Sequence, residues 1–456
     1  MKRLLLVALA VAVVASPSAS LAQTAPDPRF GIDEGLSDAQ TMVDFGAGWD
    51  RVLVPWYRIQ PRAADDFAGL GRALPERAIR DEAARGVHVA GVLHYTPSWA
   101  ARDPDDGLRA VPRDPADFGR FVFQTVRYYA GTIDEWIIWN EPDYRPGDLE
   151  GDAAVTWLGS DEDLAALIKA GYLAAKEANP RAIVSFPATA YWIDAVHNRR
   201  PLYDRVLDIF SRDPDAAAHH YYHDAVSLNI YHRPDEIYRI HGIYKDIQRQ
   251  YGLDTSTPVW LTETNSMPID DTAANCWERH TRATEPFPTS LGEQAAFAVQ
   301  ALAMAAAAGY ERIGWWRMID GRACNQTGLF GAVRDDGSHR PVADALRTTI
   351  RLLSGFSSAQ VIRNASVYQV VVDKPGPQRV TVLWNGDSAP VDVHVSRSGS
   401  TARAFSMLGV EQSLTPDGDG WTLEMPGATA YAPGDPTGYH YIGGEPTFIV
   451  EEQPSP

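Results

Sequence analysis

The stretch that decides the fold runs Trp136-Ile137-Ile138-Trp139-Asn140-Glu141-Pro142-Asp143. Its four apolar residues predict a short buried strand, because an apolar run of this length bounded by turn residues is typical of a parallel sheet. Pro142 ends the strand, since proline has no N–H to donate to a sheet. Asn140 and Glu141 are therefore expected at the carboxyl end of the strand, where barrels of parallel strands carry their active sites.

Seven further apolar runs alternate with stretches of helical periodicity, such as Leu164, Leu167 and Ile168 after the cap-like residues 160–163. This alternation predicts an α/β fold with a parallel sheet and crossover helices. With eight strands we expect a closed (β/α)8 barrel, a TIM barrel. The alternative is an open doubly wound sheet, but no glycine-rich phosphate loop follows the first strand. The expected strands span residues 30–33, 50–54, 88–93, 136–139, 182–186, 225–230, 259–262 and 312–316.

After residue 353 the pattern changes to period-two alternation, with Gly, Asp, Pro and Ser between the runs. This change predicts a C-terminal all-β domain, a β-sandwich. We expect the barrel over residues 23–355 and the sandwich over residues 356–456, and the segments 23–30 and after Tyr431 are candidates for additional sandwich strands. The expected strands of the sandwich are 367–372, 379–384, 391–395, 402–407 and 421–425.

The first residues predict a secreted protein. Lys2 and Arg3 precede an apolar run over residues 4–15, and small residues lead to a cleavage site near Ala22, as in a signal peptide over residues 1–22. The run is shorter than the roughly 20 apolar residues of a membrane helix, so we expect an extracellular or periplasmic protein without membrane insertion. The formal net charge of −18 argues against binding to nucleic acid.

A second carboxylate ends another expected strand, in the run Pro258-Val259-Trp260-Leu261-Thr262-Glu263-Thr264-Asn265. By its order along the chain this is strand seven. Strands four and seven face each other across the mouth of an eight-stranded barrel, so Glu141 and Glu263 are expected to converge. Two carboxyl groups at one site suit the cleavage of a glycosidic bond, because one protonates the departing oxygen while the other carries negative charge near the anomeric carbon.

Two more runs add to this pattern: Arg51-Val52-Leu53-Val54-Pro55-Trp56 in strand two and Leu93-His94-Tyr95-Thr96-Pro97-Ser98-Trp99-Ala100 after strand three. Together the four runs resemble clan A glycoside hydrolases. The likeness is greatest to glycoside hydrolase family 39, with family 5-like enzymes as the second choice. It covers the barrel, and the appended sandwich fits it.

This resemblance implies that Glu141 is the catalytic acid/base and Glu263 the nucleophile. It also implies that Asn140 binds the sugar 2-hydroxyl, that Arg51 orients the nucleophile, and that Tyr231 is hydrogen-bonded to the nucleophile. The sequence departs from the clan at strand six, where many members have a histidine at the position of Asn229, which leaves the roles of Asn229 and His232 open. The other candidate substrate-binding residues are Trp56, His94, Trp99 and one of the two tryptophans that end strand eight, Trp315 or Trp316.

By the same resemblance we expect a retaining hydrolase that cleaves a poly- or oligosaccharide by double displacement through a covalent glycosyl-enzyme, without metal or organic cofactor. At a carboxyl separation of about 5 Å the second carboxylate attacks directly, whereas a larger separation admits water and inverts the anomeric centre. Xylosidase, iduronidase-like and exopolysaccharide-cleaving activities all stay open, as do exo or endo action and the oligomeric state. The alternative function is a non-catalytic carbohydrate-binding protein on the same scaffold, whose mark would be a missing carboxylate.

Several other features carry weaker expectations. The two cysteines, Cys276 and Cys324, are expected to form a disulfide between the loops after strands seven and eight. Residues 219–224 are interpreted as a polar loop rather than a metal site. Trp384 and Trp421 are candidates for contact between the sandwich and a polysaccharide. The formal glycosylation sites are Asn325 and Asn364.

Overall fold

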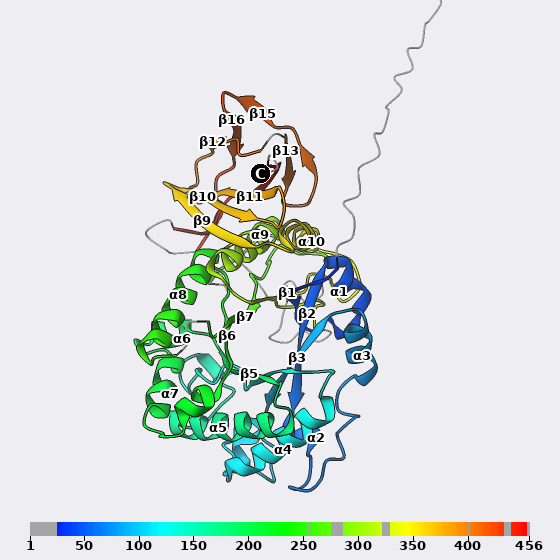
Figure 1. Cartoon of the computed structure of the whole chain (residues 1–456), viewed down its shortest axis with the longest axis vertical. Helices are drawn as coiled ribbons and strands as arrows, with labels where there is room; N and C mark the ends of the chain where they lie inside the picture. The colour runs from blue at the N-terminus through cyan, green and yellow to red at the C-terminus, as the bar shows by residue number, and fades with distance from the viewer. Residues whose placement is uncertain are drawn as a thin grey trace, which may run out of the picture.

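The computed structural model describes residues 25–152, 154–253, 256–274, 286–321, 329–399, 401–432 and 439–453. Eight parallel strands close into a barrel in chain order, which confirms the predicted TIM barrel (Figure 1). The expected signal peptide lies outside the described residues. The strands are β1 (Asp27–Ile32), β2 (Ala47–Pro55), β3 (His88–His94), β4 (Glu135–Ile138), β5 (Ile183–Thr189), β6 (Ala225–Asn229), β7 (Val259–Thr264) and β8 (Arg312–Trp315).

Helices surround the barrel, and their starts follow from the sequence (Figure 1). The predicted cap before α5 is present, because Ser160 Oγ accepts from the N–H of Asp163 and the Asp163 carboxylate accepts from the N–H of Ser160, both at 3.1 Å. The helices are α1 (Ala39–Phe45), α2 (Trp56–Ile59), α3 (Glu76–Ala84), α4 (Pro115–Tyr129), α5 (Asp161–Ala178), α6 (Trp192–Val196), α7 (Leu202–Phe210), α8 (Pro234–Gln250), α9 (Leu291–Ala308) and α10 (Pro341–Leu353).

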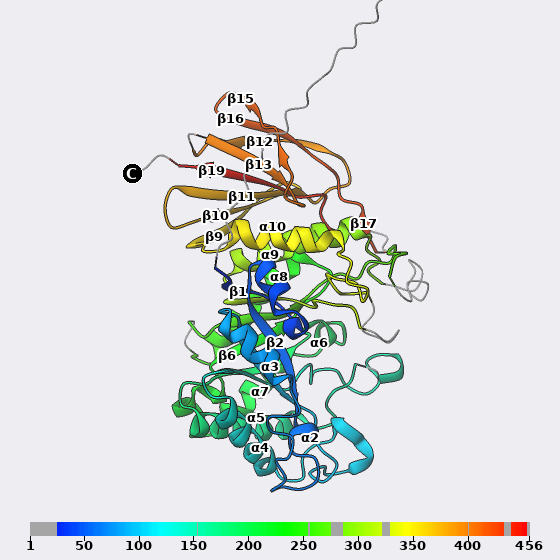
Figure 2. The same ribbon diagram turned by 90° about the vertical axis from the view of Figure 1, so that its right-hand side faces the viewer.

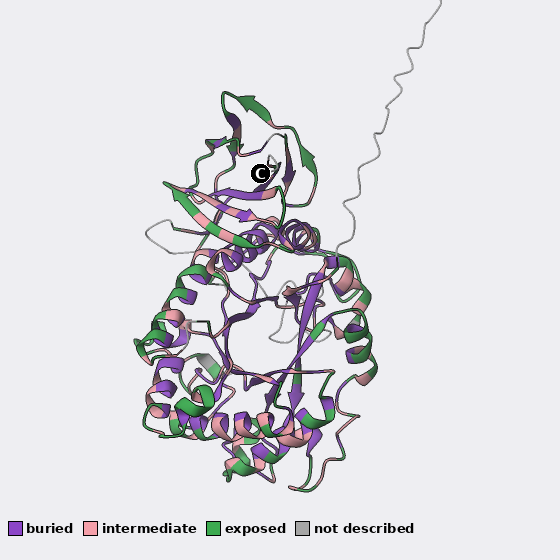
Figure 3. Ribbon diagram, viewed as in Figure 1, coloured by how far each residue is buried: buried purple, intermediate pink, exposed green. Residues whose placement is uncertain are grey.

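The interior of the barrel is filled by side chains. The indole of Trp49 on β2 lies against the neighbouring strand β1, where a Cβ added to Gly31 would come within 2.3 Å of the ring. Gly314 on β8 has the same relation to this indole, with a Cβ distance of 2.7 Å. Figure 3 shows the strands and the inward helix faces buried and the outer helix faces exposed. Glycine at these two positions therefore allows the barrel to close around a tryptophan.

The β-rich region after the barrel is a sandwich, as predicted. A six-stranded sheet in the order β14-β13-β19-β11-β10-β9 faces a three-stranded sheet in the order β12-β16-β15, and β17 pairs with β18 separately. Side chains from both sheets, among them Leu383, Val393 and Ile449, form one buried cluster between them. The strands are β9 (Ser358–Asn364), β10 (Val367–Asp373), β11 (Gln378–Asn385), β12 (Val391–Ser396), β13 (Thr401–Ser406), β14 (Glu411–Gln412), β15 (Thr415–Asp417), β16 (Gly420–Met425), β17 (Ala430–Tyr431), β18 (His440–Ile442) and β19 (Thr447–Glu452).

The candidate extra strands divide between the two parts of the chain. The segment after Tyr431 does contribute to the β-rich region, through β18 and the central strand β19. Residues 27–30 instead open the barrel as part of β1, since Asp27 pairs with Ala47 of β2. Nothing in the described part of residues 23–30 joins the sandwich.

Helix α9 joins the two parts of the molecule, as Figure 2 shows. The side chain of Gln300 donates to the carbonyl oxygens of Gly443 and Gly444, each at 3.0 Å, and accepts from the N–H of Gly443 at 2.9 Å. Within the described residues, α9 is the one helix long and apolar enough to cross a membrane, with a mean hydropathy of 1.2, and 72% of it is buried inside the protein. Its apolar character is accounted for by packing between the barrel and the sandwich.

Candidate active site

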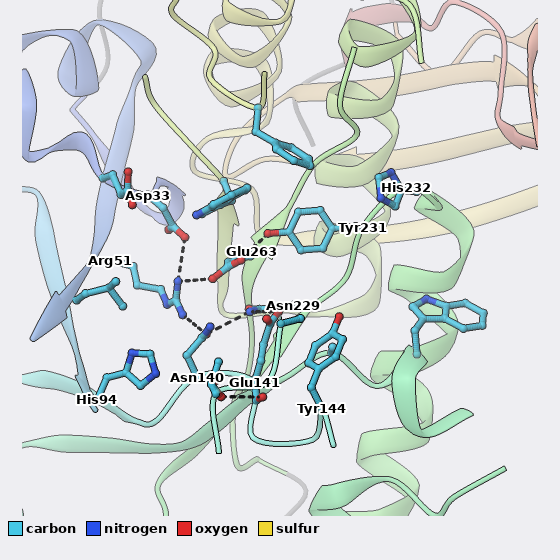
Figure 4. A pocket seen from close by; sticks show the side chains of 18 of the residues that line it. Asp33, Arg51, His94, Asn140, Glu141, Tyr144, Asn229, Tyr231, His232 and Glu263 are labelled. Carbon is cyan, nitrogen blue, oxygen red and sulfur yellow. Dashed lines mark hydrogen bonds and ion pairs between the residues drawn. The ribbon is translucent and has the colours of Figure 1, made fainter. Parts of the chain in front are cut away.

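A hollow of about 770 Å³ opens at the carboxyl ends of the barrel strands, and Glu141 and Glu263 both line it (Figure 4). Its wall combines carboxylates with aromatic rings from several loops, a composition that suits a ligand with hydroxyl groups and apolar faces. Of the sequence-predicted residues, the structure brings to this pocket Arg51, His94, Asn140, Glu141, Asn229, Tyr231, Glu263 and Trp316. The residues that sequence reasoning missed include Asp33, Glu34, Tyr95, Tyr144, Trp192, Arg233, Phe287 and Phe330.

The chain turns sharply as β4 ends, which presents two consecutive polar residues to the pocket. Neighbouring residues of a regular strand point to opposite faces. Here Trp139 and Glu141 have left-handed backbone angles, with φ of 68° and 49°. Thr156 Oγ1 fixes the turn from the following loop, 2.6 Å from the carbonyl oxygen of Asn140 and 3.0 Å from that of Glu141. As a result Asn140 and Glu141 both line the pocket.

The Glu263 carboxylate is held by a cation and a hydroxyl group. Arg51 Nη1 lies 2.5 Å from Glu263 Oε1, and the Tyr231 hydroxyl donates to Oε2. Both side chains of the ion pair are buried, with exposed fractions of 4% for Arg51 and 9% for Glu263. An ion pair and a donated hydrogen bond both favour the charged form of a carboxyl group. The environment of Glu263 therefore stabilises an anion.

The two glutamates are linked through amide side chains. Arg51 Nη2 donates to Asn140 Oδ1 at 2.5 Å, and Asn229 Nδ2 donates to Asn140 Oδ1 at 3.3 Å and to Glu141 Oε1 at 3.0 Å. Thr262 Oγ1 lies 2.8 Å from Asn229 Oδ1, which directs the Asn229 NH₂ group toward Glu141. Figure 4 shows this network between the ends of β2, β4, β6 and β7.

Glu141 has the opposite environment to Glu263. Burial raises the pKa of Glu141 to about 8, and the negative charge of Glu263 adds to the shift, whereas the hydrogen bond from Asn229 opposes it. Among the described residues, no arginine or lysine forms an ion pair with Glu141. At neutral pH the Glu141 carboxyl is mostly protonated and can donate a proton to a ligand.

A third carboxyl group, Asp33, follows β1 directly and shares the same arginine. Its Oδ2 lies 3.4 Å from Arg51 Nη1, and its side chain is only 1% exposed. Burial raises the pKa of Asp33 well above its usual range, Arg51 opposes the shift, and Glu263 adds to it. The sequence signal was available, because Asp33 is the last residue of the expected first strand, at the same barrel end as Glu141.

His94 meets the pocket as a neutral donor and acceptor. It lies flat on Tyr95, with ring centroids 3.5 Å apart. Burial, followed by the charge of Arg51, lowers the pKa of His94 to about 3. Both nitrogens are buried, so His94 borders the pocket as an uncharged ring whose two nitrogens have no partner among the described residues.

Three of the predicted tryptophans do not line the pocket, which corrects the sequence-based assignment. Trp56 is fully buried against Phe121, with ring centroids 5.6 Å apart. Trp99 packs edge-on against Trp56 and donates to the carbonyl oxygen of Gln60 at 2.8 Å. Trp315 is fully buried as the last residue of β8, and Trp316 beyond it lines the pocket. Side-chain alternation along a strand explains why only the second of the pair faces the ligand.

The β-rich region supports one wall of the pocket. Phe287 lies nearly parallel to His232, at 5.0 Å and 14°, and Tyr441 of β18 packs edge-on against Phe287 at 5.2 Å. The Tyr441 hydroxyl also donates to the carbonyl oxygen of Pro288 at 2.6 Å. Phe287 and His232 both line the pocket. The wall therefore depends on side chains from both parts of the chain.

The weaker sequence expectations have mixed outcomes. The loop before β6 does not line the pocket: His219 and His220 are exposed, and His223 is buried with Nε2 2.9 Å from the Tyr203 hydroxyl. No group of three metal-ligating side chains occurs among the described residues. Cys276, Cys324 and Asn325 lie outside the described residues, while Asn364 is exposed at the end of β9.

The two candidate tryptophans of the sandwich are buried and do not offer a free ring face. Trp384 is 3% exposed and stacks on Tyr368, with ring centroids 5.1 Å apart. Trp421 is 5% exposed, and the Arg397 guanidinium lies 5.1 Å from the centre of its ring. Trp384 nevertheless lines a hollow on the sandwich, so its predicted contact with a polysaccharide stays a prediction.

Comparison with known proteins shows a shared fold. No protein-family model and no curated protein matches the sequence. A family 39 glycoside hydrolase from the gut symbiont Bacteroides cellulosilyticus WH2 is similar in structure, with a TM-score of 0.66, 15% identity, and coverage of 94% of this chain and 81% of that chain. A family 30 endoxylanase from Clostridium papyrosolvens C71 has a TM-score of 0.58 and 13% identity, and covers 94% of this chain and 98% of its own.

A third similar structure is CelM2, a bifunctional glucanase-xylanase from a metagenome library, with a TM-score of 0.60, 12% identity, and coverage of 94% of this chain and 97% of its own. Coverage of both regions indicates that the barrel and the sandwich occur together in these proteins. The chain therefore shares its fold with these glycoside hydrolases, including the family 39 enzyme to which the sequence motifs predicted a likeness.

Proposed function

We propose that the protein is a retaining glycoside hydrolase that cleaves a poly- or oligosaccharide. One observation carries the proposal: two glutamates at the ends of β4 and β7 share a pocket and have opposite environments. Glu263 is ion-paired with Arg51 as an anion, whereas burial and the charge of Glu263 keep Glu141 protonated. Pairs of carboxyl groups separated in this way perform acid and nucleophile roles in glycosidases.

In the first step Glu141 gives its proton to the glycosidic oxygen while a carboxylate oxygen of Glu263 bonds to the anomeric carbon, and the bond to the departing sugar breaks. The negative charge of Glu263 disappears in this intermediate. Because that charge is one cause of the raised pKa of Glu141, its loss favours the Glu141 carboxylate. Glu141 then takes a proton from water as the hydroxide oxygen attacks the anomeric carbon and Glu263 departs.

The surrounding residues suit the oxocarbenium-like transition state of this reaction. Arg51 holds both Glu263 and Asn140, so the nucleophile and a sugar-binding amide keep a fixed relation. Trp316, Tyr144 and His94 contribute rings to the wall of the pocket. The residues that carry the reaction need no metal or organic cofactor.

The test is a screen of aryl glycosides and neutral polysaccharides with wild type, Glu263→Ala and Glu141→Ala, followed by NMR of the anomeric configuration of the first product. We expect retention in wild type. With azide as an external nucleophile, Glu263→Ala should give a glycosyl azide of inverted configuration and Glu141→Ala one of retained configuration. Glu177→Ala, an exposed carboxylate on α5, is the control. Full activity of Glu263→Ala on every substrate, or an inverted wild-type product, would overturn the proposal.

A non-catalytic carbohydrate-binding protein is the second candidate. It predicts retention on polysaccharide without turnover in any assay, and equal binding by wild type and Glu263→Ala. We also propose secretion, on the signal-like residues 1–22, and N-terminal sequencing of the mature protein from its host tests cleavage near Ala22.

A further inference from the structure

A second hollow, of about 440 Å³, lies where the sandwich meets helix α8 of the barrel, and we propose that it binds a neutral sugar unit of the polymer that the catalytic pocket cleaves. The proposal rests on the proposed function and extends it to a distal part of the substrate. The residues that carry it come from both parts of the chain: Asp235, Arg363, Tyr368, Trp384, Asp387 and Tyr439.

Flat groups are stacked along one side of this hollow. Trp384 of β11 lies parallel to Tyr368 of β10 at 5.1 Å and 6°, and the guanidinium of Arg363 lies 4.7 Å from the centre of the Tyr368 ring. Arg363 Nε donates to the carbonyl oxygen of Ala365 at 3.3 Å. Among the described residues, neither Nη atom of Arg363 has a hydrogen-bond or ion-pair partner. The stack thus holds a forked donor in place at the mouth of the hollow.

Acceptors lie on the same hollow. Asp387 is exposed, and its Oδ1 accepts from the N–H of Ser388 at 3.1 Å. Asp235 Oδ2 accepts from the Tyr439 hydroxyl at 2.7 Å. Adjacent sugar hydroxyls both donate and accept, so a fixed guanidinium beside carboxylates is complementary to them. Two carboxylates against one guanidinium disfavour an anionic sugar, which selects a neutral one.

The second hollow shares a wall with the catalytic pocket. Arg233 lines the catalytic pocket, and its guanidinium lies between Trp192 at 5.2 Å and Tyr439 at 5.0 Å. Trp192 faces the catalytic pocket, and Tyr439 faces the second hollow. Asp235 follows Arg233 by two residues at the start of α8. The proposal has one polysaccharide chain extend from the site of cleavage over Arg233 and Tyr439 to the second hollow.

Affinity gel electrophoresis tests the proposal without requiring turnover. Wild type, Arg363→Ala and Asp387→Asn are run through gels containing a neutral xylan, a neutral β-glucan or polygalacturonate. The matched control is Arg403→Ala, a partly exposed arginine of β13 that pairs with Glu411 and does not line the hollow. We expect at least one neutral polymer to retard wild type and Arg403→Ala equally, and to bind both other variants about fivefold more weakly, as loss of one or two hydrogen bonds predicts.

The double variant Arg363→Ala with Trp316→Ala tests whether this hollow contributes to binding separately from the catalytic pocket. If the two sites are independent, the losses of binding free energy in the two single variants add up to the loss in the double variant. Melting curves of all variants confirm folding. The proposal fails if neither neutral polymer retards wild type, if Arg363→Ala and Asp387→Asn bind as wild type, if Arg403→Ala loses as much, or if polygalacturonate binds best. Each of these results leaves the anomeric and azide experiments on Glu263 and Glu141 intact, so the two proposals fail separately.

Discussion

The two ends of the barrel each contain a buried glutamate paired with an arginine, but the pairs are built differently. At the amino end, Glu135 Oε1 accepts from Arg312 Nη2 at 2.6 Å, and Oε2 accepts from Arg312 Nε at 3.3 Å and from the Trp49 indole at 3.0 Å. At the carboxyl end, Arg51 is divided among Glu263, Asp33 and Asn140.

The difference distinguishes charged groups that are satisfied within the fold from charged groups that are suited to react with a ligand. Glu135 has donors on both oxygens, so its ion pair is complete without a ligand. The carboxyl end has more acid groups than Arg51 can neutralise, and burial together with the charge of Glu263 raises the pKa values of Asp33 and Glu141. Perturbed carboxyl groups of this kind cluster at functional sites, whereas removing one partner of a satisfied buried pair destabilises the fold.

The largest expected effect comes from a substitution at the carboxyl end of the barrel. Glu263→Gln should lower kcat on an aryl glycoside by about 10⁴-fold or more, because the amide cannot attack the anomeric carbon. The free energy of unfolding should fall less than in Glu135→Gln, because Arg51 keeps Asp33 as a second carboxyl partner. Steady-state kinetics and urea denaturation measure the two quantities. A loss of less than tenfold in kcat would remove Glu263 from the nucleophile role.

The next effect concerns the shared arginine. Arg51→Lys should lower kcat by about 100-fold, because a lysine cannot hold Glu263 and Asn140 at once with a planar fork. Arg312→Lys at the amino end is the matched control and should change kcat less than twofold. Equal losses in both variants would show that the effect comes from general destabilisation.

The converse substitution removes the negative charge of the ion pair at the amino end of the barrel. Glu135→Gln leaves Arg312 with only the more distant and more exposed Glu311 as counter-charge, so the free energy of unfolding should fall by up to about 3–5 kcal/mol with little change in kcat. Chemical denaturation at neutral pH measures the loss, and Glu311→Gln, a less buried glutamate next to Arg312, is the control. Unchanged stability would mean that Glu135 is as dispensable as a surface charge.

A pH profile sharpens the comparison. Glu141 must be protonated to act as an acid, so kcat/KM should decline as pH rises through about 8, the pKa to which burial and Glu263 raise this group. The hydrogen bond from Asn229 lowers that pKa, so Asn229→Ala should move the alkaline limb to higher pH. A limb that stays in place would separate Asn229 from the titration of Glu141.

The smallest expected effect lies at the wall of the pocket. Tyr441→Phe keeps the ring that packs on Phe287 and removes only the hydroxyl that donates to Pro288, so KM should rise about two- to fivefold with kcat unchanged. Tyr128→Phe, an exposed tyrosine of α4 that lines neither hollow, is the control for loss of a tyrosine hydroxyl. A fall in kcat without a change in KM would contradict a role in substrate binding.

The sequence predicted those strands whose apolar pattern is long enough to recognise. Apolar strands such as 88–93 gave the barrel, because closed parallel barrels repeat one pattern eight times. Strands of two or three residues, such as β14 and β17, are too short to show alternation. In β9, partly buried side chains alternate with exposed ones without a buried face, which hides an edge strand in the sequence.

The site was predicted where a residue directly ends a strand, as Glu141 and Glu263 nearly do. Asp33 has the same signal but stood outside the resemblance that drew attention to the others. Arg233 and Phe287 could not be predicted, because their places depend on loops and on packing against the sandwich. The predictions for Trp56 and Trp99 were wrong because the sequence does not show whether an aromatic residue near a strand end faces a ligand or packs against a helix.

The indole of Trp49, seated against Gly31 and Gly314, belongs to the packed interior of the barrel, which is not a pore. In the proposed reaction, the substrate therefore binds and the product leaves through the same pocket at the carboxyl ends of the strands. The departing sugar must dissociate before the next chain can bind. Binding and release then both take place at this one end of the barrel, and neither passes through its centre.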